Sequence, residues 1–125
     1  MKSKLLFVVL VILVSSLAFT SPTAAMDDDM CSHDAMTIES LHHCVDHAVE
    51  MGHITNAHWA TSLYAMLNAA QAALDRGQID TSVNILNAFI NEVEAQAGKL
   101  ILDPHGEHLI MHAEMVIAAL TAPAV

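Results

Sequence analysis

The 125-residue sequence has few residues that break or stiffen a chain: four glycines, three prolines and only 4% aromatic residues. This scarcity excludes a collagen-like repeat and a Gly/Pro-rich low-complexity segment. A hydrophobic content of 54% also argues against intrinsic disorder, because disordered chains have too few apolar residues to form a core. The length suits one domain, so we expect a single small domain with a hydrophobic core.

Positive charge is scarce too, with four Lys and Arg residues against fourteen Asp and Glu. Two of the four, Lys2 and Lys4, lie in residues 1–25, which contain no acid. Residues 26–125 therefore carry two basic and fourteen acidic residues, a formal charge of −12 with His neutral. Such a surface repels phosphate groups and anionic lipid headgroups. We expect no nucleic-acid partner and no attraction to an anionic membrane surface.

Residues 1–25 have the layout of a cleaved secretory signal peptide. Lys2 and Lys4 precede an unbroken apolar run over 5–14, and small residues precede the predicted cleavage point after Ala25. A membrane anchor is the alternative, but serine and threonine dilute the run before it reaches the ~20 apolar residues that a span needs. We therefore predict a periplasmic or extracellular protein without a stable membrane anchor after cleavage. In such a compartment disulfides can form.

Apolar residues recur with helical spacing in four segments of the remaining chain, and no window alternates like a strand. The pattern predicts helices over 38–51, 56–76, 81–97 and 104–120, with Thr37, Thr55, Asp80 and Asp103 as caps and Gly52, Gly77 and Gly98 at helix ends. Because the connections are short, neighbouring helices should be antiparallel. The sequence thus predicts an all-α fold, an up-down four-helix bundle over 37–121. An acidic flexible tail (26–36) precedes it and a C-terminal tail (122–125) follows it.

Three stretches in the predicted helices read LYAMLNAAQAALDRG (63–77), LNAFINEVEAQAGK (86–99) and LIMHAEMVIAAL (109–120). Together they resemble the FIMAH domain family. The resemblance implies a small helical module of exported bacterial and archaeal proteins, often appended to larger domains. It implies no settled catalytic activity and no agreed ligand. Compared with the family, this chain carries an unusual enrichment of His, Met and Cys near its N-terminus.

The predicted first helix carries three histidines on a polar arc opposite its apolar stripe. His43 and His47 are at i and i+4, a spacing that lets two imidazoles chelate one Zn²⁺, Cu²⁺ or Ni²⁺. His42 and Asp46 form a second such pair. The alternative is a solvated polar face that happens to contain histidine. Two ligands make only a weak site without a third or fourth.

The predicted last helix repeats this pattern with His105, His108 and His112, flanked by Met111 and Met115. Thioether and imidazole ligands together suit copper. The alternative places both methionines at the edge of the core and makes His112 an interface residue. Since the first and last helices of an up-down bundle are neighbours, the two histidine groups form one site only if their imidazoles converge.

Cys31 and Cys44 are the only cysteines, and an oxidising compartment favours a disulfide between them. Its short loop should stabilise the fold by about 3 kcal/mol, mainly by restricting the unfolded chain. In the alternative, both thiolates bind a metal, and His33 with His47 (or His43) completes a tetrahedral set. Asp, Met, Cys and His in the tail are typical either of a metal-collecting segment or of an acidic solvating one.

No catalytic motif is present: the sequence has no nucleophile elbow, no His-Glu-x-x-His and no phosphate-binding loop. Ser62 and Ser82 follow helix-surface positions without a base partner. We therefore expect a non-catalytic binding or accessory module that contacts an unknown protein partner and requires no cofactor. One alternative is a soluble Cu- or Zn-binding protein that uses the His, Met and Cys residues. Another is a pH sensor, because protonation of nine histidines would largely neutralise the acidic surface.

Overall fold

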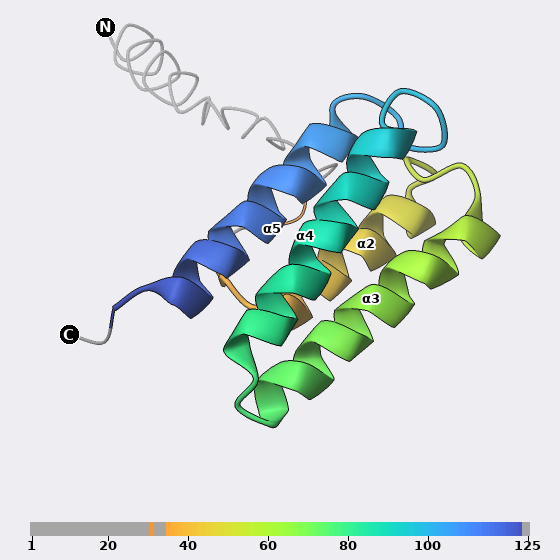
Figure 1. Cartoon of the computed structure of the whole chain (residues 1–125). Coiled ribbons are helices and arrows are strands. Elements are labelled where there is room, and N and C mark those ends of the chain that lie inside the picture. The colour runs from red at the N-terminus through yellow and green to blue at the C-terminus, as the bar shows by residue number, and fades with distance from the viewer. Residues whose placement is uncertain (1–30, 32–34, 124–125) are drawn as a thin grey trace, which may run out of the picture.

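The computed structural model describes Cys31 and residues 35–123. The predicted signal peptide, most of the predicted acidic tail and the last two residues of the predicted C-terminal tail lie outside the described residues. The described part forms four helices: α2 (Ile38–Glu50), α3 (Ala57–Asp75), α4 (Ile79–Gln96) and α5 (His105–Thr121). Each helix packs on its neighbour in the sequence, and α5 closes the ring against α2 (Figure 1). The prediction of an all-α four-helix bundle is confirmed.

The helix starts agree only in part with the predicted caps. Thr37 caps α2 in a capping box with Ser40, as expected. Asn56 caps α3 in place of Thr55, whose N–H and hydroxyl instead donate to the Leu100 carbonyl of a distant loop. α4 begins at Ile79, before the predicted cap. A hydroxyl beside a helix start therefore need not cap it when a tertiary contact competes.

The α2–α3 and α4–α5 loops lie at the same end of the bundle (Figure 1). The N–H of Leu102 donates to the His53 carbonyl at 2.8 Å, and Thr55 and Leu100 pair at the same distance. Ile54 and Ile101 form an antiparallel bridge there, and both side chains are buried. These contacts fix the spacing between the start of α5 and the end of α2, the two helices that hold the cysteine and histidine residues of interest.

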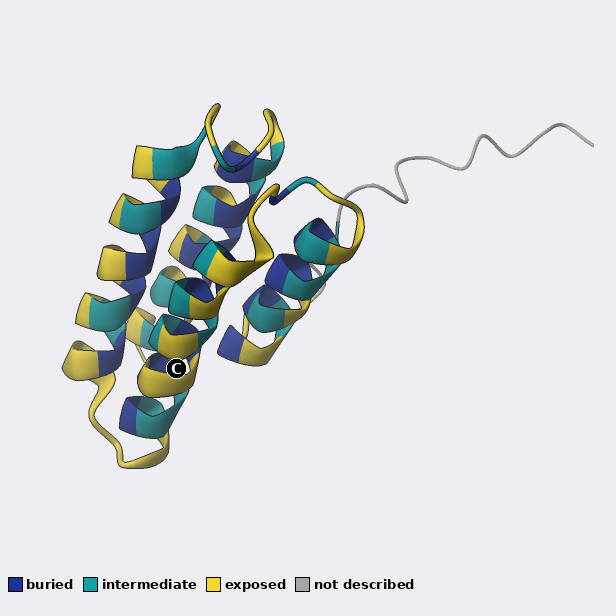
Figure 2. Cartoon of the chain, turned by 90° about the vertical axis from the view of Figure 1, so that its right-hand side faces the viewer, coloured by how far each residue is buried: buried dark blue, intermediate teal, exposed yellow. Residues whose placement is uncertain are grey.

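The buried faces of all four helices meet in one core (Figure 2). Most of the predicted apolar positions are buried in it, with Leu41, Leu63, Leu86 and Phe89 fully enclosed. Two polar side chains, Ser82 and His112, are fully buried as well. The expectation that Ser82 lies on the surface is wrong, because Ser82 shares the helical face of Leu86, Phe89 and Val93.

Candidate functional site: a disulfide between two histidines

A disulfide joins Cys31, which precedes α2, to Cys44 within it, with the two Cα atoms 5.2 Å apart. Cys44 is buried on the face of α2 that meets the core, one turn after Leu41. Cys31 is half-buried and packs against the same core. The disulfide therefore holds Cys31 against the bundle.

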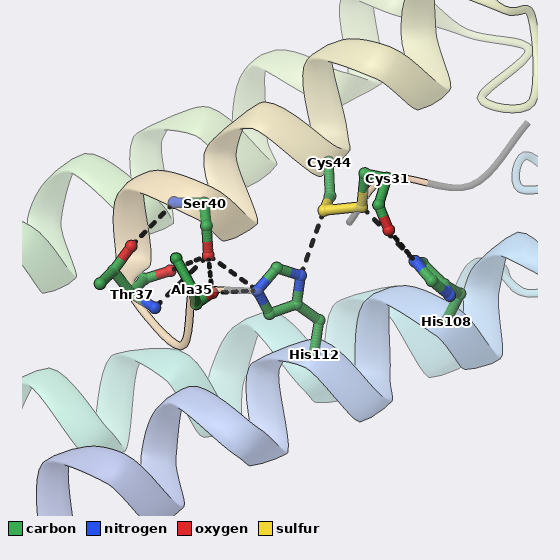
Figure 3. Close-up of a disulfide and its surroundings, with 7 residues drawn as sticks. All are labelled: Cys31, Ala35, Thr37, Ser40, Cys44, His108 and His112. Atoms are coloured by element: carbon green, nitrogen blue, oxygen red, sulfur yellow. Dashed lines mark hydrogen bonds between the residues drawn. A yellow bond between two sulfur atoms is a disulfide. The ribbon is translucent and has the colours of Figure 1, made fainter. Parts of the chain in front are cut away.

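His112 lies beside this disulfide on α5 (Figure 3). Its Nδ1 is 3.1 Å from the Cys44 sulfur, and its Nε2 is 2.8 Å from the Ser40 hydroxyl and 3.2 Å from the Ala35 carbonyl oxygen. A carbonyl oxygen only accepts, so Nε2 is the nitrogen that carries the proton. This assignment rests on the hydrogen-bond network and directs the lone pair of Nδ1 toward the sulfur atoms.

His108 approaches the other sulfur, one helical turn before His112. Its Nε2 lies 3.4 Å from Cys31 Sγ and 3.2 Å from the Cys31 carbonyl oxygen (Figure 3). The α2–α5 contact thus places an imidazole next to each sulfur. We call Cys31, Cys44, His108 and His112 the sulfur–imidazole cluster.

The remaining histidines that were predicted as metal ligands on the two helices lie in two places. His47 and His105 line a small cavity of about 10 Å³ beside the disulfide, together with His108. His42 and His43 line a groove on the other side of α2, facing α3. The structure therefore places His43 and His47 at different contacts of α2 and gathers His47, His105, His108 and His112 near the disulfide. Met111 is 46% exposed, Met115 is half-buried, and His33 lies outside the described residues.

The groove between α2 and α3 is open, with a volume of about 410 Å³. Ile38 and Leu67 are its buried apolar members. Its polar lining consists of Glu39, His42, His43, Asp46, Asn68 and Gln71. Periodicity predicted the polar arc on the first helix, but it gave no indication that α3 would turn this arc into a groove.

A histidine–aspartate pair and an aromatic ring adjoin this groove. His42 Nδ1 lies 3.4 Å from Asp46 Oδ2, and the His42 ring contacts the Tyr64 ring with centroids 4.8 Å apart. Burial, followed by the hydrogen bond and negative charge of Asp46, raises the pKa of Tyr64 to about 12. Tyr64 is therefore a neutral hydrogen-bonding group throughout the physiological pH range.

A further histidine pair joins the α2–α3 loop to the first residue of α5. The His53 and His105 rings stack, with centroids 3.4 Å apart and planes 14° from parallel. His53 Nε2 is buried without a hydrogen-bond partner in the described part of the chain. No local pattern indicates this contact, because His53 lies in the α2–α3 loop and His105 is the first residue of α5, far along the chain.

A model of the FIMAH domain matches residues 38–118, more than half of the chain and all four helices. The chain belongs to the FIMAH domain family, as its sequence resemblance indicated. At the level of the family it is a helical accessory module, and the family's members are domains of exported proteins. Comparison with curated proteins and with solved structures found no match. Among the described residues, no helix combines the length and apolar character needed to cross a membrane.

Proposed function

We propose that this chain is a non-catalytic accessory module that binds a protein partner through the groove between α2 and α3. The single observation that carries this proposal is the groove itself, which joins apolar side chains to a rim of carboxylate, imidazole and amide groups. Such a mixture of apolar surface and a few polar groups is typical of recognition sites. Family membership supports the accessory role but assigns no partner to it.

The chemistry of the groove favours a partner segment with positive charge. Glu39 is exposed and Asp46 half-exposed on its α2 side, and only Arg76 and Lys99 oppose fourteen acids in residues 26–125. Complementary charge accelerates encounter and suppresses wrong partners. We therefore propose that a basic peptide segment of the partner lies along the groove, with an apolar side chain against Ile38 and Leu67.

The proposed location is the periplasm or the extracellular space, reached through the predicted signal peptide over 1–25. The same acidity supports the proposal that neither nucleic acid nor an anionic membrane surface is the partner. Protein binding of this kind requires no cofactor and no catalytic residue. Each of these statements extends beyond family membership and is open to separate test.

Affinity capture with three versions of the mature chain tests the groove. The native chain, a Glu39→Lys/Asp46→Lys chain and a Glu94→Lys/Glu114→Lys control are immobilised and exposed to envelope extract of the source organism. Both double variants change the net charge by the same amount, but only the first alters the groove. A partner retained by the native chain and the control, and lost from the groove variant, supports the proposal. Equal recovery on all three chains contradicts it.

A second function, Zn²⁺ or Cu²⁺ binding, is favoured by a different observation. Cys31, Cys44 and His112 bring three potential ligand atoms within 4.8 Å of one another. Metal titration of the chain with mass detection separates this function from protein binding. Failure of both the oxidised and the reduced chain to retain either ion at micromolar concentration would exclude metal binding and leave the groove proposal intact.

A further inference from the structure

We propose that the sulfur–imidazole cluster is a redox-gated Zn²⁺ site: the disulfide closes it, and reduction of the disulfide opens it. In this view, Cys31, Cys44 and His112, whose ligand atoms lie within 4.8 Å of one another, are the first three ligands. His108 supplies the fourth once a shift of Cys31 breaks the contact between His108 Nε2 and the Cys31 carbonyl oxygen and the ring proton moves to Nδ1. The inference rests on the second proposed function and deepens it, because it names the ion and the redox state in which these residues bind it. It does not depend on the groove.

The distances support this assignment. Cys44 Sγ lies 3.1 Å from His112 Nδ1, and Cys31 Sγ lies 3.4 Å from His108 Nε2. In a tetrahedral site with Zn–S near 2.3 Å and Zn–N near 2.0 Å, a sulfur and a nitrogen ligand lie roughly 3.5 Å apart. Both sulfur–nitrogen pairs are therefore close to the spacing that a shared ion requires. The bond between the sulfurs is what keeps an ion out.

The position of the proton on the His112 ring supports the proposed Zn²⁺ site independently of these distances. Metal-ligating histidines usually donate their other ring N–H to a carboxylate or a backbone carbonyl, which fixes the ring and its tautomer. Here the Nε2–H of His112 faces the Ala35 carbonyl oxygen and the Ser40 hydroxyl. Nδ1 is thereby directed at Cys44 Sγ as an acceptor, which is the form that binds Zn²⁺. The ring is held as a ligand before any ion arrives.

The fold confines the movement needed on reduction to one residue. Cys44, His108 and His112 are on helices that pack against each other, and Cys44 and His112 are almost fully buried. Cys31 precedes α2 and is only half-buried, so breaking the disulfide leaves it free to move away from Cys44. A shift of Cys31 alone makes room for an ion between the two sulfurs.

The chemistry balances with a dithiol as the reductant. The dithiol transfers two electrons and two protons to the disulfide and itself becomes a disulfide, while Cys31 and Cys44 become thiols. Zn²⁺ then displaces one proton from each thiol and binds the two thiolates with the neutral imidazoles. A small disulfide reverses the step: it takes two electrons from the two thiolates and two protons from water and becomes a dithiol, while the Cys31–Cys44 bond re-forms and the ion is released. Thiolate with imidazole is a ligand set that Zn²⁺ favours in proteins.

Zn²⁺ titration of the full mature chain in both redox states tests this proposal. The reduced chain is prepared with a dithiol, which is removed without oxygen, and Zn²⁺ is then titrated against a chelating dye and counted by native mass spectrometry. We expect one tightly bound Zn²⁺ in the reduced chain and an affinity lower by roughly 100-fold or more in the oxidised chain. Equal affinity in the two states, or no binding by the reduced chain, would overturn the proposal.

Variants at the histidines assign the ligands. His112→Gln and His108→Ala should each weaken Zn²⁺ binding to the reduced chain by about tenfold or more, whereas His43→Ala, on the groove side of α2, should leave it unchanged. Circular dichroism checks that each variant folds. As a second measurement, bound Zn²⁺ should slow alkylation of both thiols in the native chain but not in the His112→Gln chain. Native-like binding and thiol protection in the His112→Gln chain would exclude this site.

Discussion

Ser40 and His112, separated by 72 positions in the sequence, approach each other to 2.8 Å between the serine Oγ and the imidazole Nε2. Ser40 is also the third residue of α2 and the partner of Thr37 in its capping box. The same hydroxyl therefore takes part in the helix start and in the α2–α5 contact. The start of α2, the Ala35 carbonyl and the buried ring of α5 are thus linked by one polar network. Within a core, such a network stabilises the fold only while all of its members are paired.

Loss of the Ser40 hydroxyl should therefore destabilise the protein more than loss of an ordinary surface hydroxyl. We expect Ser40→Ala to lower the free energy of unfolding by about 2 kcal/mol, because it removes both the reciprocal cap and a partner of a buried imidazole. Urea denaturation of the oxidised chain measures this change. Thr61→Ala is the control, since its exposed hydroxyl only bonds to the His58 carbonyl within the same helix. Equal effects of the two substitutions would contradict the prediction.

Gly106 lies at the close approach between the end of α4 and the first turn of α5. A Cβ atom at this position would meet the Ala97 Cβ at 2.9 Å and the Ile101 side chain at 3.8 Å. We expect Gly106→Ala to lower the free energy of unfolding by roughly 1–3 kcal/mol through overpacking, although alanine favours helix. Ala97→Gly in the same chain should restore part of the loss. Thermal denaturation of the native chain and the two variants tests this, and a stabilised Gly106→Ala chain would refute it.

Tyr64 is the only tyrosine, so its titration can be followed directly by the ultraviolet absorbance of tyrosinate. Its pKa of about 12 results first from burial and then from Asp46. We expect Asp46→Asn to lower this pKa toward 10.0, but not fully to it, because burial persists. An unchanged pKa in the Asp46→Asn chain would show that the carboxylate has no influence.

The raised pKa of Tyr64 also predicts how stability depends on pH. The unfolded chain loses the tyrosine proton near its ordinary pKa of 10.0 and the folded chain only near 12, so between these values the folded state binds more protons. Stability should therefore be fully present below pH 10 and fall as the pH rises toward 12. Urea denaturation across this range, compared between the native and Tyr64→Phe chains, isolates the effect. Parallel pH profiles would contradict it.

Ser82 offers a substitution that should increase stability. Its side chain is fully buried, and its hydroxyl oxygen has no hydrogen-bond partner among the described residues. We expect Ser82→Ala to raise the free energy of unfolding by about 1 kcal/mol, because an unpaired buried hydroxyl is removed and alanine favours helix. Ser62→Ala is the matched control, since that hydroxyl donates to the Trp59 carbonyl. A loss of stability in the Ser82→Ala chain, measured by urea denaturation, would contradict this.

The sequence by itself determined the helices, their order and most of the core. Local rules are sufficient for these features: apolar spacing selects the buried face, and Thr37 and Gly52 act at helix ends that lie close by in the chain. Where a distant contact competes, those rules failed. Thr55 bonds to the loop at Leu100 and caps no helix.

Only the tertiary structure decided which histidines meet. His43 and His47 are one turn apart on α2, yet one lines the groove toward α3 and the other the cavity toward α5. His112, by contrast, is separated from Cys44 by 68 positions and lies 3.1 Å from its sulfur. Helical spacing fixes which residues share a face, but the rotation of a helix and its distance from a neighbour depend on how complete side chains pack across the core. That packing, and no local pattern, places an imidazole beside each sulfur of the disulfide.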